Sequence, residues 1–517
     1  MALSNGQLLK LEQKPLNVGL IGAVRSTHGQ AQEVRSMPDF EKRFKVRKSF
    51  ALMTDDEKKR IHEAAIEILE HTGVRVHSKT ARKALKHAGA HVDDLTLDVK
   101  MSGDLIDSLI SKVPSKITLA GRTKEHDLPV DGTHLYFTTD GCGVAVWDYS
   151  TNTRRRSLLD DVRRTAIISD WLPYVSIYEP MVVAHDVPED EHVVRGMKTA
   201  MENTSKHILT ESTTNVEEAQ VQVQMAAEVV GGVEELRKRY YMSAMVCTIS
   251  PLVLDESATE AAMVWAENHV PIHITSMAAA GLSGPATLAG DLVVCHAETL
   301  ALACAVEAHS PGAPVLYGSV LSSIDPMTGS YVSGSPESLL LCAGSVEMGK
   351  YCGFPISTGG FGAGAKFPGS QASIENAMSS CTCGLVGGEV VNGLGVVDFS
   401  ALLSYEQLMI DHEIAGMTVR TYQGMDVTDE SLAVDVIKTV GIGGSFLAQR
   451  HTLKHLGELY RSLLWKDYIP GPNQTISDVM DLAKNKYQWI LDNHMPEPLE
   501  SGLKSELDRL VHEHSVG

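Results

Sequence analysis

The chain lacks an excess of basic residues, long apolar runs and a recognisable export signal. Its 517 residues include 45 Lys and Arg against 65 Asp and Glu, which gives a formal net charge of −20. A basic nucleic-acid groove is therefore not expected, and the acidic balance is typical of a protein that stays dispersed in solution. No apolar run reaches the roughly 18 residues of a membrane span. The N-terminal stretch MALSNGQLLKLEQKPLNVGLIGAV also has no signal-peptide pattern, so we expect a cytoplasmic protein without membrane or nucleic-acid partners.

Metal-binding and disulfide patterns are missing as well. The eight cysteines are scattered through apolar segments, which is typical of buried free thiols in a reducing compartment. Cys381 and Cys383 form a C-x-C pair inside a helical pattern, but no second pair of cysteine or histidine residues stands at zinc spacing. The sequence therefore predicts that the chain alone binds no metal.

One glycine-rich stretch, STGGFGAGAKFPGSQASIENA at 357–377, fits neither phosphate-binding motif. In a P-loop the lysine directly follows a glycine, whereas Lys366 follows an alanine; the glycines here are spaced G-x-G-x-G and not G-x-G-x-x-G. Two interpretations remain open. The stretch is either a strand-to-helix connection without a ligand, or a tightly curved loop that brings Phe361 and Phe367 to a ligand other than a phosphate.

Signatures of common catalytic groups are also absent. The metalloprotease motif H-E-x-x-H does not occur, and no G-x-S-x-G elbow follows a predicted strand. A Schiff-base enzyme needs a lysine at a strand end, and the nearest, Lys366, lies in the middle of a loop. The sequence thus shows no nucleophile.

Short β-branched runs alternate with helical patterns from about residue 155 onward. Seven buried strands are predicted, with an eighth at 134–139 or after residue 430. The seven runs are 174–184, 206–213, 241–250, 271–277, 314–320, 355–360 and 392–398. Parallel strands alternating with helices predict an α/β fold, a (β/α)8 TIM barrel. An open doubly wound sheet is the alternative, although the chain has no glycine fingerprint for one.

Both ends of the chain are predicted to elaborate this barrel. We assign 1–130 to an N-terminal extension with an α+β elaboration, 131–460 to the barrel, and 461–517 to a C-terminal helical segment. Within the N-terminal part, a helix is expected to begin at Thr54, which is followed by acidic residues. The segment LYFTTDGCGVAVWDYSTNT predicts a hairpin about Asp140–Gly141.

In such a barrel, ligand-binding groups lie just beyond the carboxyl ends of the strands. That rule selects residues that are mainly hydroxyl-bearing, acidic or aromatic. They are Tyr178, Glu179, His185, Glu211, Ser212, Thr213, Ser250, Pro251, Ser276, Met277, Ser319, Ser322, Asp325, Phe361, Lys366, Phe367, Asp398, Ser400 and Glu406.

Four long motifs add a family resemblance. They are LSGPATLAGDLVVCHAETLALACAVEAHSPGAPVLYG, GSPESLLL, GAGAKFPGSQASIENA and VGIGGSFLAQRHTLKHL. Through them the chain, from about residue 54 to 510, resembles the trimethylamine methyltransferase superfamily. The resemblance implies a (β/α)8 barrel that moves a methyl group from an amine to the cobalt of a small corrinoid protein. Archaeal trimethylamine enzymes carry pyrrolysine in the barrel, whereas this chain has only standard residues. The resemblance therefore implies the non-pyrrolysine branch, whose members use glycine betaine, proline betaine or carnitine.

Quaternary-amine chemistry is consistent with the missing nucleophile. The positive charge already activates the methyl group, because the leaving group is a neutral tertiary amine. The protein then has to hold the cation and orient one methyl group. Aromatic faces attract such a cation by about 0.5–2 kcal/mol each. We expect Phe361 to form this cage, with Tyr178, Tyr331, Phe137 and Phe367 as further members.

Charged residues complete the predicted site. Glu211 and Glu179 are expected either to face the cation or to pair with an Arg or Lys of the barrel. A betaine carboxylate is expected to be held by Lys366, His185 or backbone N–H groups of the loops. We expect glycine betaine as the methyl donor, which would yield dimethylglycine, and the corrinoid of a partner protein as the acceptor. We also expect a homo-oligomer and no cofactor bound by the chain itself. The alternatives are the same chemistry on proline betaine or carnitine, a Schiff-base lyase or aldolase using Lys366, and a non-catalytic betaine-binding protein.

Overall fold

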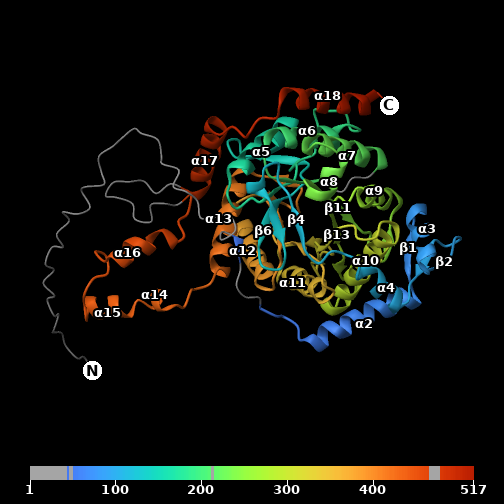
Figure 1. Cartoon of the computed structure of the whole chain (residues 1–517), viewed down its shortest axis with the longest axis horizontal. Coiled ribbons are helices and arrows are strands. Elements are labelled where there is room, and N and C mark those ends of the chain that lie inside the picture. The colour runs from blue at the N-terminus through green and yellow to red at the C-terminus, as the bar shows by residue number, and fades with distance from the viewer. Residues whose placement is uncertain (1–43, 46–49, 211–214, 465–477, 517) are drawn as a thin grey trace. The chain divides into compact units, whose positions relative to one another are not determined.

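The computed structural model describes residues 44–45, 50–210, 215–464 and 478–516, and its centre is a sheet of eight parallel strands (Figure 1). The strands follow one another around the sheet in chain order, and each pairs in parallel with its neighbours. A parallel bridge between Tyr317 and Ile356 joins the two remaining edges. The strands are β6 (Tyr136–Thr139), β9 (Ile177–Tyr178), β10 (His207–Thr210), β11 (Met242–Cys247), β13 (Ile272–Ser276), β15 (Val315–Ser319), β18 (Ser357–Gly359) and β19 (Val390–Leu394). The predicted (β/α)8 barrel is confirmed, and its uncertain eighth strand is the one at 134–139.

A layer of helices surrounds the barrel and covers the outer face of its strands. Because both faces of the sheet are covered, nearly every strand residue is buried. The helices are α5 (Leu159–Trp171), α6 (His192–Asn203), α7 (Val216–Val230), α8 (Val233–Arg239), α9 (Glu256–Glu267), α10 (Leu288–His309), α11 (Pro336–Tyr351), α12 (Ser370–Leu385) and α13 (Tyr405–Tyr422). By length and composition α10 is apolar enough to cross a membrane, but 78% of its most apolar window is buried in the protein. It is a core helix of the barrel.

The N-terminal elaboration begins with α2 (Asp55–His71). As predicted, Thr54 caps this helix: its side chain accepts from the Glu57 backbone, and the Glu57 carboxylate accepts in return. The elements that follow are β1 (Val74–Val76), α3 (Lys79–Ala88), β2 (His91–Val92), β3 (Asp98–Lys100), α4 (Gly103–Ile110), β4 (Ile117–Leu119), η3 (Lys124–His126) and β5 (Leu128–Val130). A short strand from the loop after β11, β12 (Val253–Leu254), pairs with β1. This pairing attaches the elaboration to the barrel.

The predicted hairpin about Asp140–Gly141 is wrong. β6 pairs with β19 on one side and β9 on the other, so it has no free edge for a hairpin partner. The hairpin lies one strand later, where β7 (Ala145–Asp148) pairs with β8 (Thr153–Arg156). Asp140 and Gly141 therefore lie at the carboxyl end of a barrel strand, which is where functional groups are expected.

Loops at the carboxyl ends of the strands form two small sheets beside the barrel mouth. The first combines β14 (Ala279–Ala280), β16 (Ser322–Ile324) and β17 (Tyr331–Val332). The second combines β20 (Val396–Val397) and β21 (Leu402–Leu403) with β7 and β8. Loops from distant parts of the chain are thereby fixed next to one another.

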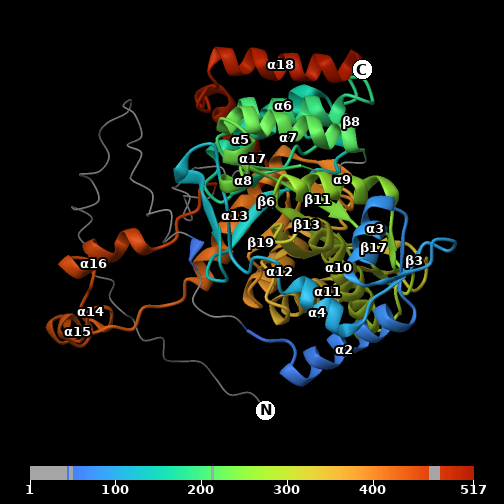
Figure 2. The same ribbon diagram turned by 45° about the vertical axis from the view of Figure 1, so that its right-hand side comes forward.

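The C-terminal segment is helical, as predicted. Within 461–517 the helices are α17 (Val479–Asn493) and α18 (Ser501–Val516). The short helices α14 (Asp429–Leu432), α15 (Val434–Val440), α16 (Arg450–His455) and η4 (Leu456–Glu458) precede them, within the range that was assigned to the barrel. α17 contacts α5 and α13, and α18 contacts α6 and α7 (Figure 2). The domain boundaries after residues 130 and 460 stay predictions, since 43–517 form one unit by their contacts.

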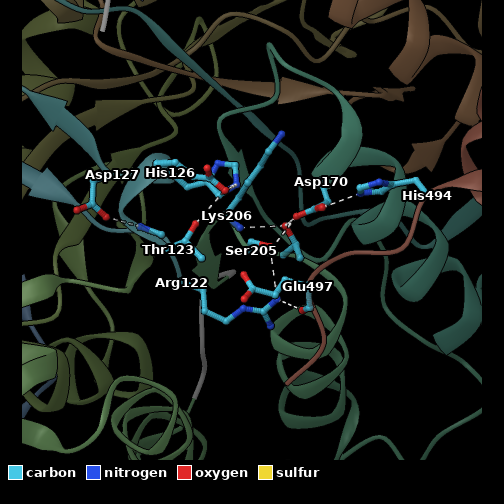
Figure 3. A network of polar contacts seen from close by, with 12 residues as sticks. Arg122, Thr123, His126, Asp127, Asp170, Ser205, Lys206, His494 and Glu497 are labelled. Carbon is cyan, nitrogen blue, oxygen red and sulfur yellow. Dashed lines mark hydrogen bonds and ion pairs between the residues drawn. The ribbon is translucent and has the colours of Figure 1, made fainter. Parts of the chain in front are cut away.

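A polar network at the amino end of β10 ties the end of α17 to the barrel (Figure 3). His494 lies 2.7 Å from Asp170, whose other carboxylate oxygen accepts from the Ser205 backbone at 2.7 Å. Burial acts to raise the pKa of Asp170, but the hydrogen bond from His494 and the charge of Lys206 hold it at about 2. This value lies below the ordinary 3.8, so the charged carboxylate stabilises the fold fully above pH 3.8. The contribution is lost as the pH falls through about 2.

Candidate functional site

A pocket opens at the carboxyl end of the barrel. Residues at or just after the ends of several barrel strands line it, for example Asp140 after β6, Glu179 after β9 and Met277 after β13. With the space at its open mouth, the pocket encloses about 990 Å³. Its position is that of a small-molecule site in a TIM barrel.

Three aromatic rings from different loops line this pocket: Phe361, Tyr331 and Phe399. The rings of Tyr331 and Phe399 meet edge to face, with centroids 5.2 Å apart. Phe361 is only 8% exposed, and its ring meets Phe137 edge to face at 5.9 Å. The Phe361 backbone N–H donates to the Asn392 carbonyl at 2.9 Å, which fixes the loop after β18 to β19. These rings form an aromatic wall of the kind that attracts organic cations.

The turn that carries Phe399 is strained. Asp398, Phe399 and Ser400 have φ values of 54°, 59° and 68°, so three successive non-glycine residues are left-handed. Such residues cost on the order of 1–3 kcal/mol each and persist only where the surroundings hold them. Here Asp398 pairs with Lys366 at 2.6 Å and with Arg154 at 2.7 Å. Ser400 Oγ donates to Asp140 at 2.8 Å, so this strained turn is anchored directly to the pocket wall.

Three carboxylates line the same pocket: Asp140, Glu179 and Glu375. Glu179 is nearly inaccessible, and its carboxylate lies against Gly141, where an added Cβ would stand 2.7 Å from Oε1. Burial raises the pKa of Asp140, and a bound cation would favour its charged form. No Lys, Arg or His lines the pocket among the residues that the structure describes. The lining is thus suited to a cation and has no basic partner for an anion.

The structure brings two of the predicted cage residues, Phe361 and Tyr331, into the pocket. Phe137 lies behind Phe361 and supports its ring. Tyr178 is elsewhere: it is fully buried, and its hydroxyl donates to the Val162 carbonyl of α5 at 2.8 Å. Successive side chains of a strand point to opposite faces, so Tyr178 faces the helices. That these rings bind a cation stays a prediction.

Of the residues selected at strand ends, Glu179, Met277 and Ser400 also line the pocket. The remaining predicted cage and charged residues that the structure describes do not line it. Phe367 is 62% exposed and stacks on Trp147, with ring centroids 6.3 Å apart. Lys366 pairs with Asp398, and its Nζ lies 3.8 Å from the centre of the Phe399 ring. His185 is exposed, with Nδ1 3.1 Å from the Val183 carbonyl. Glu211 lies outside the described residues.

Asp140, Glu375 and Phe399 line the pocket but are not among the residues predicted from the sequence, although the sequence holds a signal for two of them. Asp140 directly follows the run at 134–139, but that run was only one of two choices for the eighth strand. Phe399 directly follows Asp398, which was selected. Glu375 belongs to α12 and reaches the pocket from a helix, so the rule for strand ends could not find it.

One known protein family matches nearly the whole chain. The family model described as trimethylamine methyltransferase (MTTB) matches residues 23–516. This chain belongs to the trimethylamine methyltransferase family. It is thus a methyltransferase, and its barrel mouth is the place where the family's chemistry is to be sought.

Curated relatives cover most of the chain. Trimethylamine methyltransferase MttB of Desulfitobacterium hafniense (strain DSM 10664 / DCB-2) is 32% identical over 89% of this chain and 93% of its own length. Its namesake from Methanosarcina barkeri is 30% identical over 89% and 94%. The glycine betaine methyltransferase of D. hafniense (strain Y51) is 28% identical over 89% and 96%. The solved monomethylamine methyltransferase (MtmB) of M. barkeri covers 91% of this chain and 97% of its own, with a TM-score of 0.45 and 14% identity.

Proposed function

We propose that this methyltransferase moves a methyl group from a quaternary amine to the Co(I) of a corrinoid-binding protein. The observation that carries the proposal is the lining of the mouth pocket. It combines three aromatic rings and three carboxylates with no Lys, Arg or His among the described residues. Such a wall attracts an alkylammonium ion through both its rings and its charges.

The chemistry needs little more than positioning. The Co(I) electron pair attacks the methyl carbon, the carbon–nitrogen bond breaks, and its electron pair stays on nitrogen. The products are a methylated Co(III) corrinoid and a neutral tertiary amine, and no proton moves. This agrees with the sequence, which contains no motif for an activated nucleophile. A tertiary amine carries the activating charge only while it is protonated, whereas a quaternary amine carries it permanently, and this chain has no pyrrolysine to activate the unprotonated amine. We therefore propose that trimethylamine is not its substrate.

The methyl donor is either a quaternary amine with a carboxylate or one without. Glycine betaine is the one that the sequence favoured, and a relative at 28% identity is named for it. Its carboxylate would need donors, but Lys366 and His185 do not line the pocket. Each of the two amide side chains in the lining already donates one hydrogen bond, Asn392 Nδ2 to Ser357 at 3.1 Å and Asn376 Nδ2 to Asp411 at 3.0 Å. Pocket charge therefore favours a quaternary amine without a carboxylate, such as choline.

Labelled substrates test the reaction itself. Choline and glycine betaine with deuterated N-methyl groups would each be incubated with the protein and free Co(I) cobalamin, and the products analysed by mass spectrometry. We expect labelled methylcobalamin and the tertiary amine in equal amounts, with more product from choline. If the protein binds these amines but forms no labelled methylcobalamin, and no methylated corrinoid when a corrinoid protein is supplied, the chain is a binding protein and not the proposed enzyme. Faster turnover of glycine betaine than of choline would contradict the preference for a substrate without a carboxylate, but it would still support methyl transfer from a quaternary amine.

The proposed reaction needs a second protein. The acceptor corrinoid belongs to a separate protein that has to approach the open mouth, and we place both in the cytoplasm. A homo-oligomer is supported by exposed apolar side chains between residues 425 and 459, among them Ile442 and Leu447. No structural observation favours the Schiff-base alternative, since Lys366 pairs with Asp398 beside the pocket.

A further inference from the structure

Two histidines and a cysteine meet on the outer side of the barrel. His62 of α2, His296 of α10 and Cys352 at the end of α11 bring their ligand atoms within 4.8 Å of one another. His62 Nδ1 lies 2.9 Å from His296 Nε2. The Cys352 sulfur lies 3.7 Å from His62 Nδ1 and 3.9 Å from His296 Nε2. None of these three residues lines the mouth pocket.

These distances are close to those around a tetrahedral zinc ion. With Zn–N bonds of about 2.0–2.1 Å and a Zn–S bond of about 2.3 Å, two nitrogens stand about 3.3 Å apart and a nitrogen and a sulfur about 3.6 Å apart. The observed 2.9, 3.7 and 3.9 Å differ from those values by about 0.4 Å or less. Small side-chain rotations are enough to place all three atoms around one ion.

A further contact orients the most buried of the three residues. Tyr317 of β15 places its hydroxyl 2.9 Å from His296 Nδ1. The other ring nitrogen, Nε2, is thereby directed towards His62 and Cys352, as a second partner does for many metal-bound histidines. His296 is fully buried, whereas His62 and Cys352 are half-buried, which leaves an approach for an ion and a water ligand.

We propose that His62, His296 and Cys352 bind a zinc ion that fastens α2 to α10 and α11. Two histidines and one thiolate are ligands that zinc prefers, and a water would complete four-coordination. Because the three residues lie away from the pocket, the ion would act on stability and not on methyl transfer. Sequence spacing alone predicted no metal, since His62 and His296 are 234 positions apart. The competing explanation is a simple hydrogen bond between the two imidazoles, which 2.9 Å also fits.

Zinc content and cobalt spectroscopy separate these explanations. The full chain, purified without chelator and incubated with zinc, should retain about one zinc per chain after gel filtration. Cobalt(II) should produce a thiolate-to-metal charge-transfer band, and Cys352→Ser should abolish it. His62→Ala should lower zinc content to about a tenth or less. The matched controls are His71→Ala, an exposed histidine on the same helix, and Cys381→Ser on α12, which should leave zinc content unchanged.

Stability gives a second readout. A chelator should lower the Tm of the wild-type protein and leave that of Cys352→Ser unchanged, while methyl transfer at temperatures below both Tm values stays the same. Substoichiometric zinc in the wild type after incubation would overturn the proposal. So would a cobalt charge-transfer band that persists in Cys352→Ser. Should a variant fail to fold, the zinc content and cobalt spectrum of the wild type still decide the question.

Discussion

Replacing Phe361 by leucine tests the aromatic wall of the pocket. Leucine keeps an apolar side chain against the pocket but removes the face of the ring. The loss of one cation–π contact, about 0.5–2 kcal/mol, should weaken binding of a quaternary amine about 2- to 30-fold. Tyr331 and Phe399 remain, so binding should not be abolished.

The structure also indicates how much Phe361→Leu should lower the stability of the folded protein. Although Phe361 lies in a glycine-rich loop, it is only 8% exposed and packs against Phe137. Losing that edge-to-face contact costs about 0.5–1.5 kcal/mol. We therefore expect a small drop in Tm and no change in secondary structure. Truncation to alanine would add a cavity and confuse the two effects.

Isothermal titration calorimetry with choline measures the affinity without any corrinoid. The neutral isostere of choline, in which carbon replaces nitrogen, reports the part of binding that does not depend on charge. Phe361→Leu should reduce the preference for choline over this isostere. Phe367→Leu is the matched control, because Phe367 stacks on Trp147 and does not line the pocket, and it should behave as the wild type. An unchanged preference in Phe361→Leu would refute the assignment of this ring to the cation site.

Three other changes test separate parts of the account. Glu179→Gln removes a charge from the pocket wall and should raise the KM for a quaternary amine about 10-fold. Glu217→Gln changes an exposed residue and should leave KM unchanged. Equal KM values in the two variants would exclude an electrostatic role of Glu179. Asp170→Asn removes a carboxylate whose pKa is about 2 in the folded protein and ordinarily 3.8. This difference corresponds to about 2 kcal/mol of folding free energy. The variant should be less stable at pH 7 by urea unfolding, with a difference that shrinks as the pH falls from 4 towards 2; a difference independent of pH would contradict the ion pair. Ile442→Glu with Leu447→Glu should lower the molar mass measured by light scattering after gel filtration, and a monomeric wild type would contradict the proposed oligomer.

The barrel could be predicted from sequence because its strands are buried on both faces. Such strands read as short runs rich in β-branched residues between helical patterns, and the predicted runs contain or overlap the observed strands. The hairpin prediction failed for a physical reason. A turn signal such as Asp140–Gly141 depends only on neighbouring residues, whereas the strands that pair with β6 are β9 and β19, which lie much later in the chain. Nothing local shows that both edges of a strand are already occupied.

The site was predicted less completely, because it depends on which way side chains point and on contacts between distant loops. Tyr178 and Glu179 are neighbours at the same strand end, yet only Glu179 lines the pocket. The alternation of faces within a strand of two residues is too short to read from sequence. Phe399 meets Tyr331 because two separate small sheets flank the mouth, and no pattern in one stretch of sequence encodes that meeting.

Comparing methyl transfer from a quaternary and a tertiary amine tests the central claim most directly. The protein would be mixed with Co(I) cobalamin, or with a corrinoid protein reduced to Co(I), and with choline, glycine betaine or trimethylamine. Absorbance then follows the conversion of Co(I) to the methylated Co(III) form. We predict conversion with a quaternary amine and none above background with trimethylamine. Turnover of trimethylamine at the rate of the best quaternary amine would contradict the claim that the substrate's own charge activates the methyl group.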